Sequence, residues 1–174
     1  MNDIMALTRK PCKRNNYQTK YQFNQIMHRY FCDQRPTSTE ILQEIADAVR
    51  GPISKSSIYR ACARVKRVKY QRRWVEIKCF MTKRSPPLIP PQVLLRMRRD
   101  FNLMQNAFPR LKDPPRKIFG AVTFFVREML WKYRVVDASG MLDSRFDDYF
   151  PYPKCKKTAE EYRRMFQLLD KYIS

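Results

Sequence analysis

The most distinctive chemistry in the sequence is a long run of basic side chains that contains no carboxylate. No acidic residue occurs between Asp47 and Glu76. That interval contains the basic residues Arg50, Lys55, Arg60, Arg64, Lys66, Arg67, Lys69, Arg72 and Arg73. Such a concentration of like charges is self-repelling unless an anionic partner or salt neutralises it. Nucleic acid is the commonest partner of this kind, so the run predicts contacts to phosphates. The alternative is a solvated basic face that only aids solubility.

The charge of the whole chain follows the same pattern. The 174 residues carry a formal net charge of +20. Residues 1–99 hold 22 basic and 6 acidic side chains, whereas residues 100–174 hold 14 basic and 10 acidic ones. Hydrophobic residues make up 44% of the chain, which is typical of a folded protein and not of a disordered polycation. Solubility alone does not account for the asymmetry, which favours a nucleic-acid-binding surface in the first half.

The residue types needed for most enzymatic sites are scarce or scattered. His28 is the only histidine, the three glycines are isolated, and the five cysteines include no C-x-x-C pair. These counts exclude most histidine-based triads, glycine-rich nucleotide loops and zinc ribbons. We therefore expect no enzyme activity, no metal site and no cofactor. One alternative is that Asp143, Asp147 and Asp148 hold magnesium, but a solvated loop over residues 137–153 is the favoured interpretation.

No segment of the sequence has the composition of a membrane anchor. The longest uncharged run, residues 85–95, has eleven residues and includes four prolines, whereas a spanning helix needs about 20 apolar residues. The N-terminal residues lack the apolar core of a signal peptide. We therefore expect no membrane partner.

Apolar residues recur at helical spacing along most of the chain, so the sequence predicts an all-α, compact multi-helix domain. Residues 1–16 show no such periodicity and are predicted to form a basic N-terminal tail. A basic helical half over residues 17–84 follows, and a second helical half covers residues 92–174. The proline-rich residues 85–91 separate the two halves, because paired prolines favour an extended segment. In the second half, a predicted helix over residues 118–133 begins apolar nearly all round, as buried central helices do.

Residues 37–68 are predicted to form a helix-turn-helix-like pair. The first helix begins at a capping box over residues 37–40 and ends at the Gly51-Pro52 pair. Ser54 is the predicted N-cap of the second helix. The arginine face of that helix consists of Arg60, Arg64 and Arg67. Such a helix fits a DNA groove or a row of phosphates. The alternative is an ordinary helical hairpin with a solvated face.

Predicted contacts to nucleic acid extend beyond this pair of helices. Arg96 and Arg99 lie outside the apolar seam of a predicted helix in the second half and continue the basic surface. Trp74 is a candidate for stacking on a base, although such a residue more often packs at the edge of a core. The full set of predicted nucleic-acid contacts is Lys55, Arg60, Arg64, Lys66, Arg67, Lys69, Arg72, Arg73, Arg96 and Arg99.

The second half carries a series of motifs in a characteristic order. The series consists of the proline segment at residues 86–91, a helix at 97–111, the Pro115-Arg116-Lys117 turn, a helix at 124–130 and FDDYFP at 146–151. Together with a first helix and an amphipathic last helix, this order over residues 17–173 resembles the poxvirus-type late transcription factor family, the third of the late factors. The chain departs from that family in lacking the paired cysteines of an N-terminal zinc ribbon, since only Cys12 lies there.

This resemblance implies a viral factor that binds late promoters and contacts viral RNA polymerase or other transcription factors, with a cyclin-like helical core as in general initiation factors. It also implies action in the infected host cell, in a cytoplasmic viral factory or the nucleus, with the virion as a further location. Two alternatives remain. One is a viral structural or genome-packaging protein. The other is a recombinase-type helix-turn-helix module, whose recognition helix residues 53–60 resemble. The sequence gives neither the oligomeric state nor a base preference.

Overall fold

The computed structural model describes residues 13–32, 35–117, 119–135, 139, 141 and 143–174, and these residues form helices and no strands. This confirms the predicted all-α fold. The α-helices are α1 (Lys13–Tyr30), α2 (Thr39–Ala48), α3 (Lys55–Arg64), α4 (Trp74–Thr82), α5 (Pro91–Ala107), α6 (Val122–Lys132) and α7 (Lys156–Ile173). Short 3-10 helices are η1 (Val68–Arg73), η2 (Phe108–Arg110) and η3 (Ser144–Asp148).

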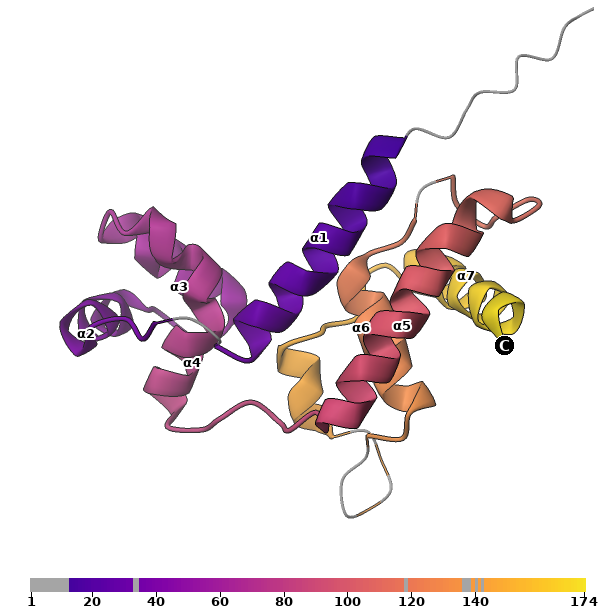
Figure 1. Cartoon of the computed structure of the whole chain (residues 1–174). Coiled ribbons are helices and arrows are strands. Elements are labelled where there is room, and N and C mark those ends of the chain that lie inside the picture. The colour runs from indigo at the N-terminus through magenta and orange to yellow at the C-terminus, as the bar shows by residue number, and fades with distance from the viewer. Residues whose placement is uncertain (1–12, 33–34, 118, 136–138, 140, 142) are drawn as a thin grey trace, which may run out of the picture.

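Helix α1 runs through the middle of the molecule, with α2, α3 and α4 on one side and α5, α6 and α7 on the other (Figure 1). It packs against α4 of the first group and against α5 and α6 of the second. Phe23 of α1 stacks on Phe101 of α5, with ring centroids 4.5 Å apart. The first helix therefore joins the two predicted helical halves into one packed unit.

The start of α1 corrects the predicted boundary of the N-terminal tail. The helix begins at Lys13, so residues 13–16 are helical and do not belong to a tail. Residues 1–12 of the predicted tail lie outside the described residues. The first turns of α1 are built from Lys, Arg, Asn and Gln, which propagate a helix without any apolar periodicity. For this reason the pattern of apolar residues did not reveal them.

The second half contains the most deeply buried helix. Phe124, Phe125 and Met129 of α6 have no exposed surface, which confirms that the predicted helix is buried. It begins at Val122 and not at residue 118, since residues 119–121 are not helical. The extended proline segment before α5 also packs on the core, because Ile89 is buried and the Tyr30 hydroxyl donates a hydrogen bond to the Pro87 carbonyl. Pro91 is the first residue of α5, where its missing N–H leaves no hydrogen bond unmade.

Residues 143–150 of the acidic loop before α7 are anchored to the core, although Asp147 and Asp148 keep the exposed carboxylates that a solvated loop predicts. Asp147 forms an ion pair with Arg127 of α6, and Asp148 lies 3.0 Å from the ammonium of Lys78 in α4. Both cations are buried, and a buried cation is stable only when it is paired. The adjacent aromatic residues Phe146, Tyr149 and Phe150 are also buried. The loop thus closes over the junction of the two halves.

Candidate nucleic-acid interface

The turn between α2 and α3 has the local geometry that its residues predict. Gly51 adopts the left-handed conformation, with a φ of 76°. The Ser54 hydroxyl accepts a hydrogen bond from the Ser57 amide at 3.2 Å, and the Ser57 hydroxyl accepts one from the Ser54 amide at 2.8 Å. This reciprocal pair confirms Ser54 as the N-cap of α3. Helix α3 then packs its apolar face on α2 and α4.

The beginning of α2 differs from the predicted capping box. The N-cap is Ser38, one residue later than the expected Thr37, so the helix starts at Thr39, and Ser38 makes no capping hydrogen bond. Thr37 instead donates hydrogen bonds to the Glu76 carboxylate of α4, from its amide at 2.6 Å and from its hydroxyl at 2.9 Å. The Thr37 hydroxyl, which the local pattern predicted to cap α2, is therefore bonded to the Glu76 carboxylate of α4.

The end of α3 also corrects the prediction. The helix stops at Arg64, because Lys66 is left-handed, with a φ of 57°. The Arg67 amide donates to the Cys62 carbonyl at 2.7 Å, which together with the Lys66 amide bond to Ala63 forms a Schellman motif. The predicted helix through Val68 is therefore wrong, and Val68 is 56% exposed. Arg67 consequently does not share the α3 face of Arg60 and Arg64.

Three predicted contacts are exposed side chains of α3, namely Lys55, Arg60 and Arg64. Arg60 and Arg64 lie one turn apart on one face, whereas Lys55 projects from the other side of the helix, where its ammonium lies 5.8 Å from the centroid of the Trp74 ring. Arg60 donates a long hydrogen bond of 3.3 Å to the Ser56 carbonyl, and Arg64 donates one of 2.9 Å to the Ala48 carbonyl at the end of α2. A guanidinium has five N–H donors, so both arginines retain donors for a phosphate. This face carries no carboxylate.

Two other predicted contacts form ion pairs with carboxylates of the protein itself. Arg67 forms an ion pair with Glu44 of α2 at 3.0 Å. Arg73 contacts Glu76 at 3.3 Å and donates to the Arg35 carbonyl at 2.7 Å. These interactions join η1 to α2 and to the segment before α2. Their cationic groups are therefore partly neutralised before any nucleic acid binds.

The remaining predicted contacts of the first half lie around η1. Lys66, Lys69 and Arg72 are exposed, and none of them has a carboxylate partner among the described residues. The Lys69 ammonium sits 5.3 Å from the centroid of the Tyr70 ring. These three cations continue the carboxylate-free surface beyond the end of α3.

The structure adds Arg29 of α1, which the sequence did not single out. One small hollow is lined by Arg29 and Arg72 together with the Arg73–Glu76 pair, and a second one by Arg29 and Lys55. Desolvation lowers the pKa of Lys55, and the positive charge of Arg29 lowers it further. The three residues, here called the Arg29 cation cluster, have no carboxylate partner among the described residues. Only the packing of α1 on α4, next to α3 and η1 in sequence and in space, brings them together, so no local sequence signal marked Arg29.

Arg96 and Arg99 do not join this surface. Both lie on α5, which is on the opposite side of α1 from α3 (Figure 1). Arg96 is exposed, and the Arg99 guanidinium lies 3.4 Å from the Asp100 carboxylate. The predicted contacts therefore separate into one coherent surface around α3 and two isolated arginines on α5.

The described residues also bear on three other predicted features, namely base stacking by Trp74, metal binding and membrane insertion. Trp74 is buried and stacks on Tyr149 with centroids 5.7 Å apart, so it belongs to the core and its ring is not presented to a base. No group of three or more His, Cys, Asp or Glu side chains among the described residues is arranged to hold a metal ion. None of the described helices is long and apolar enough to cross a bilayer.

Three comparisons with known proteins return no similarity for this chain. No family model matches it, no curated protein matches it, and no solved structure shares its fold closely enough to count as a match. The resemblance to the late transcription factor family therefore stays a prediction from the sequence. The candidate interface is argued from its own residues.

Proposed function

We propose that this chain is a non-enzymatic DNA-binding protein that contacts the phosphate backbone through α3 and the Arg29 cation cluster. The observation that carries the proposal is that α3 exposes three cations, Lys55, Arg60 and Arg64, and contains no carboxylate. A bound polyanion would relieve the repulsion between Lys55 and Arg29. A purely solubilising surface has no need to hold two cations side by side.

The dimensions of α3 are compatible with this role. The helix has 10 residues, which corresponds to a length of about 15 Å. The major groove of B-DNA is about 12 Å wide and admits an α-helix. Arg29 and Lys55 at the start of α3 and Lys66 after its end are then candidates for contacts to the phosphates on either side. Contacts of this type set affinity and orientation and need no base reading.

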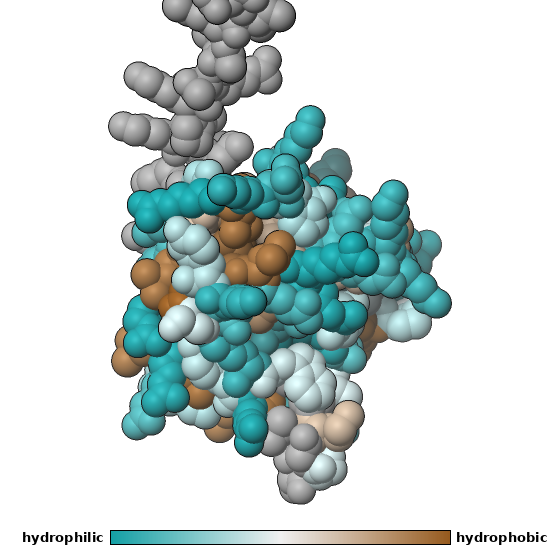
Figure 2. Space-filling model, turned by 90° about the vertical axis from the view of Figure 1, so that its right-hand side faces the viewer, coloured by the Kyte–Doolittle hydropathy of each residue, from teal (hydrophilic) through white to brown (hydrophobic). Residues whose placement is uncertain are grey.

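The more specific role that we propose is a transcription factor for late viral genes, which rests on the resemblance of the second half. A factor of this class also contacts proteins of the transcription machinery. The side of the molecule shown in Figure 2 is largely hydrophilic but carries one hydrophobic patch. Leu103 of α5 and Leu168 of α7 are among the exposed apolar side chains of the second half. We assign the protein contacts to this half, away from α3.

A salt series tests the DNA-binding proposal. Each lost phosphate contact lowers the slope of log affinity against log salt by about 0.9, so Arg60→Ala, Arg64→Ala and Arg72→Ala together should reduce it by about 2.7. The matched control replaces Arg98, Arg110 and Lys112 with Ala, because these exposed cations of the second half lie away from α3. Equal slopes for the two triple variants would overturn the assignment of the face.

A comparison of promoter and random duplexes separates the two classes of DNA-binding protein. A transcription factor is expected to bind late-promoter DNA more tightly than random DNA or to bind viral RNA polymerase in a purified binding assay. A genome-packaging protein is expected to bind all duplexes equally and to leave the polymerase unbound. The second pattern would replace the transcription role while leaving the phosphate contacts in place.

A further inference from the structure

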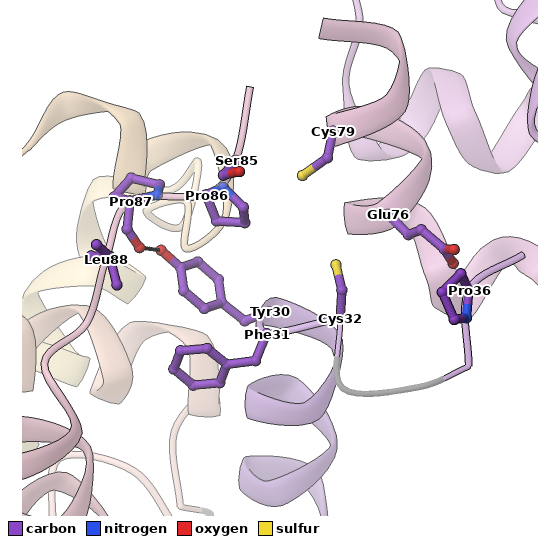
Figure 3. A pocket seen from close by; sticks show the side chains of 10 residues that line it. All are labelled: Tyr30, Phe31, Cys32, Pro36, Glu76, Cys79, Ser85, Pro86, Pro87 and Leu88. Carbon is purple, nitrogen blue, oxygen red and sulfur yellow. Dashed lines mark hydrogen bonds between the residues drawn. The ribbon is translucent and has the colours of Figure 1, made fainter. Parts of the chain in front are cut away.

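A pocket of about 450 Å³ lies between the end of α1, helix α4 and the proline segment. Figure 3 shows Cys32 and Cys79 on one side of this pocket, with Tyr30, Pro87 and Leu88 on the other. The two cysteines are far apart in sequence, yet their sulfur atoms point toward one another (Figure 3). Both are free thiols and both are partly exposed. The packing of α1 against α4 therefore brings together two accessible thiols.

The surroundings give the two thiols different chemical characters. The neighbouring Cys32 thiol lowers the pKa of Cys79 to about 7, against the effect of burial, and Tyr149 and the charge of Lys78 lower it further. The Cys32 thiol itself donates to the Arg29 carbonyl at 3.7 Å. The neighbouring Cys79 sulfur and burial raise the pKa of Cys32. Because the thiolate is the nucleophilic form, Cys79 is the attacking sulfur and Cys32 is the adjacent thiol that can resolve an intermediate.

The other described cysteines do not combine an accessible thiol with a second thiol beside it. Cys62 is fully buried on the inner face of α3, so an oxidant has no access to it. Cys155 is exposed, and hydrogen bonds from Thr158 lower the pKa of its thiol. However, Cys155 has no second described thiol facing it in a pocket. These two residues provide internal controls for reactivity.

We propose that Cys32 and Cys79 form a reversible intramolecular disulfide when the protein meets a peroxide. In the first step the Cys79 thiolate attacks one oxygen of hydrogen peroxide, the O–O bond breaks, and hydroxide leaves after taking up a proton as water. Cys79 is then a sulfenic acid. In the second step the Cys32 sulfur attacks the Cys79 sulfur, the S–O bond breaks, and a second water leaves. Two thiols and one peroxide give one disulfide and two waters.

The bond would tie the end of α1 to α4 and fill one side of the pocket. Glu76 lies one turn before Cys79 on α4 and lines the same pocket. Its carboxylate also accepts a hydrogen bond from Thr37, which precedes α2, and pairs with Arg73, which precedes α4. Oxidation would therefore fix this group to α1 covalently. The inference concerns a modification of the thiols and does not depend on DNA binding.

Peroxide titration of the full chain, followed by mass spectrometry, tests the proposal. We expect the intact mass to fall by two hydrogens and one cross-linked peptide pair to contain Cys32 and Cys79, with the change reversed by dithiothreitol. In Cys32→Ser, the Cys79 sulfenic acid should persist and be trapped by dimedone, whereas Cys79→Ser should give neither product. Cys155→Ser is the matched control and should still form the disulfide.

Other oxidation patterns would overturn the proposal. A principal disulfide through Cys12 or Cys155, a dimer linked between two chains, or equal dimedone labelling of Cys79 in the unaltered chain and in Cys32→Ser would each do so. Circular dichroism of the serine variants is needed to confirm that both remain helical. If Cys32→Ser unfolds, Cys32→Ala serves for the same trapping experiment.

Discussion

Asp100 of α5 makes a buried connection between three helices that can be tested by substitution. Its side chain is only 3% exposed, and it accepts hydrogen bonds from the Lys132 ammonium at 2.6 Å and from the Tyr133 hydroxyl. The same ammonium contacts Asp170 of α7 at 2.6 Å. Burial raises the pKa of Asp100, but the hydrogen bonds from Lys132 and Tyr133 outweigh it, so the pKa lies below its ordinary value.

The hydrogen bonds of Asp100 set the loss of unfolding free energy that a substitution should cause. A hydrogen bond to a charged group contributes about 1.5–3 kcal/mol. Asp100→Asn retains an oxygen for the Tyr133 hydroxyl but loses the charge facing Lys132, so we expect a loss of about 2 kcal/mol at pH 7. For a chain of this length that loss lowers the melting temperature by about 4–8 °C. Asp100→Ala removes both acceptors and should cost about 3–4 kcal/mol.

The loss of stability in Asp100→Asn should be larger at neutral pH than at acidic pH. Because the folded pKa of Asp100 is lowered, the charged carboxylate stabilises the fold fully above the unfolded pKa of about 3.9. This contribution disappears as the pH falls through the folded pKa. The difference between the unaltered chain and Asp100→Asn should therefore begin to shrink below about pH 4, where the unfolded chain takes up the proton, and should vanish once the folded carboxylate is protonated as well.

Urea unfolding followed by circular dichroism at pH 7, 5, 4 and 3 measures this difference. Asp170→Asn is the matched control, because it removes the other, more exposed partner of Lys132 and should cost at most about 1 kcal/mol. The reasoning is refuted if Asp100→Asn is no more destabilising than the control at pH 7. It is equally refuted if the loss at pH 3 equals the loss at pH 7.

Two further substitutions test backbone and packing constraints by thermal unfolding. A Cβ on Gly120 would lie 2.8 Å from ring carbons of both Phe125 and Tyr162, so Gly120→Ala should destabilise the fold by about 1–3 kcal/mol; a loss of a few tenths would contradict the tight packing. Lys66 occupies the left-handed position after α3, so Lys66→Gly should stabilise the fold by about 1 kcal/mol while Lys66→Ala should not. Equal stabilities of the two variants would contradict the strain at this position.

The features that the sequence predicted correctly are those set by neighbouring residues. Ser54 caps α3 because its partner Ser57 is three residues away, and Pro91 begins α5 because its ring fits the first turn. The apolar character of α6 likewise predicts burial from the helix alone. The cap and the proline act within one turn, and the burial of α6 follows from the composition of one helix, so residue types along a single segment contain the necessary information.

The features that could not be predicted from the sequence depend on partners from distant segments. Thr37 does not cap α2 because Glu76 of α4 accepts its hydrogen bonds. Arg67 turns back to Glu44 because Lys66 ends α3 early. The Arg29 cation cluster exists only because α1 passes beside Lys55. No periodicity encodes these contacts, since each of them requires the relative placement of helices that are far apart in sequence.

The placement of carboxylates explains why one surface is left strongly positive. The carboxylates that form ion pairs within the described residues are Glu44, Glu76, Asp100, Asp143, Asp147, Asp148, Glu161 and Asp170. Glu44 and Glu76 are the members of this set on α2 and α4, and both face cations that hold η1 in place. None of the set faces Lys55 or the outward face of α3. Salt screens exposed charges more than partly buried pairs such as Lys132–Asp100. On the proposed function, rising salt should therefore release DNA from α3 well before it loosens the fold.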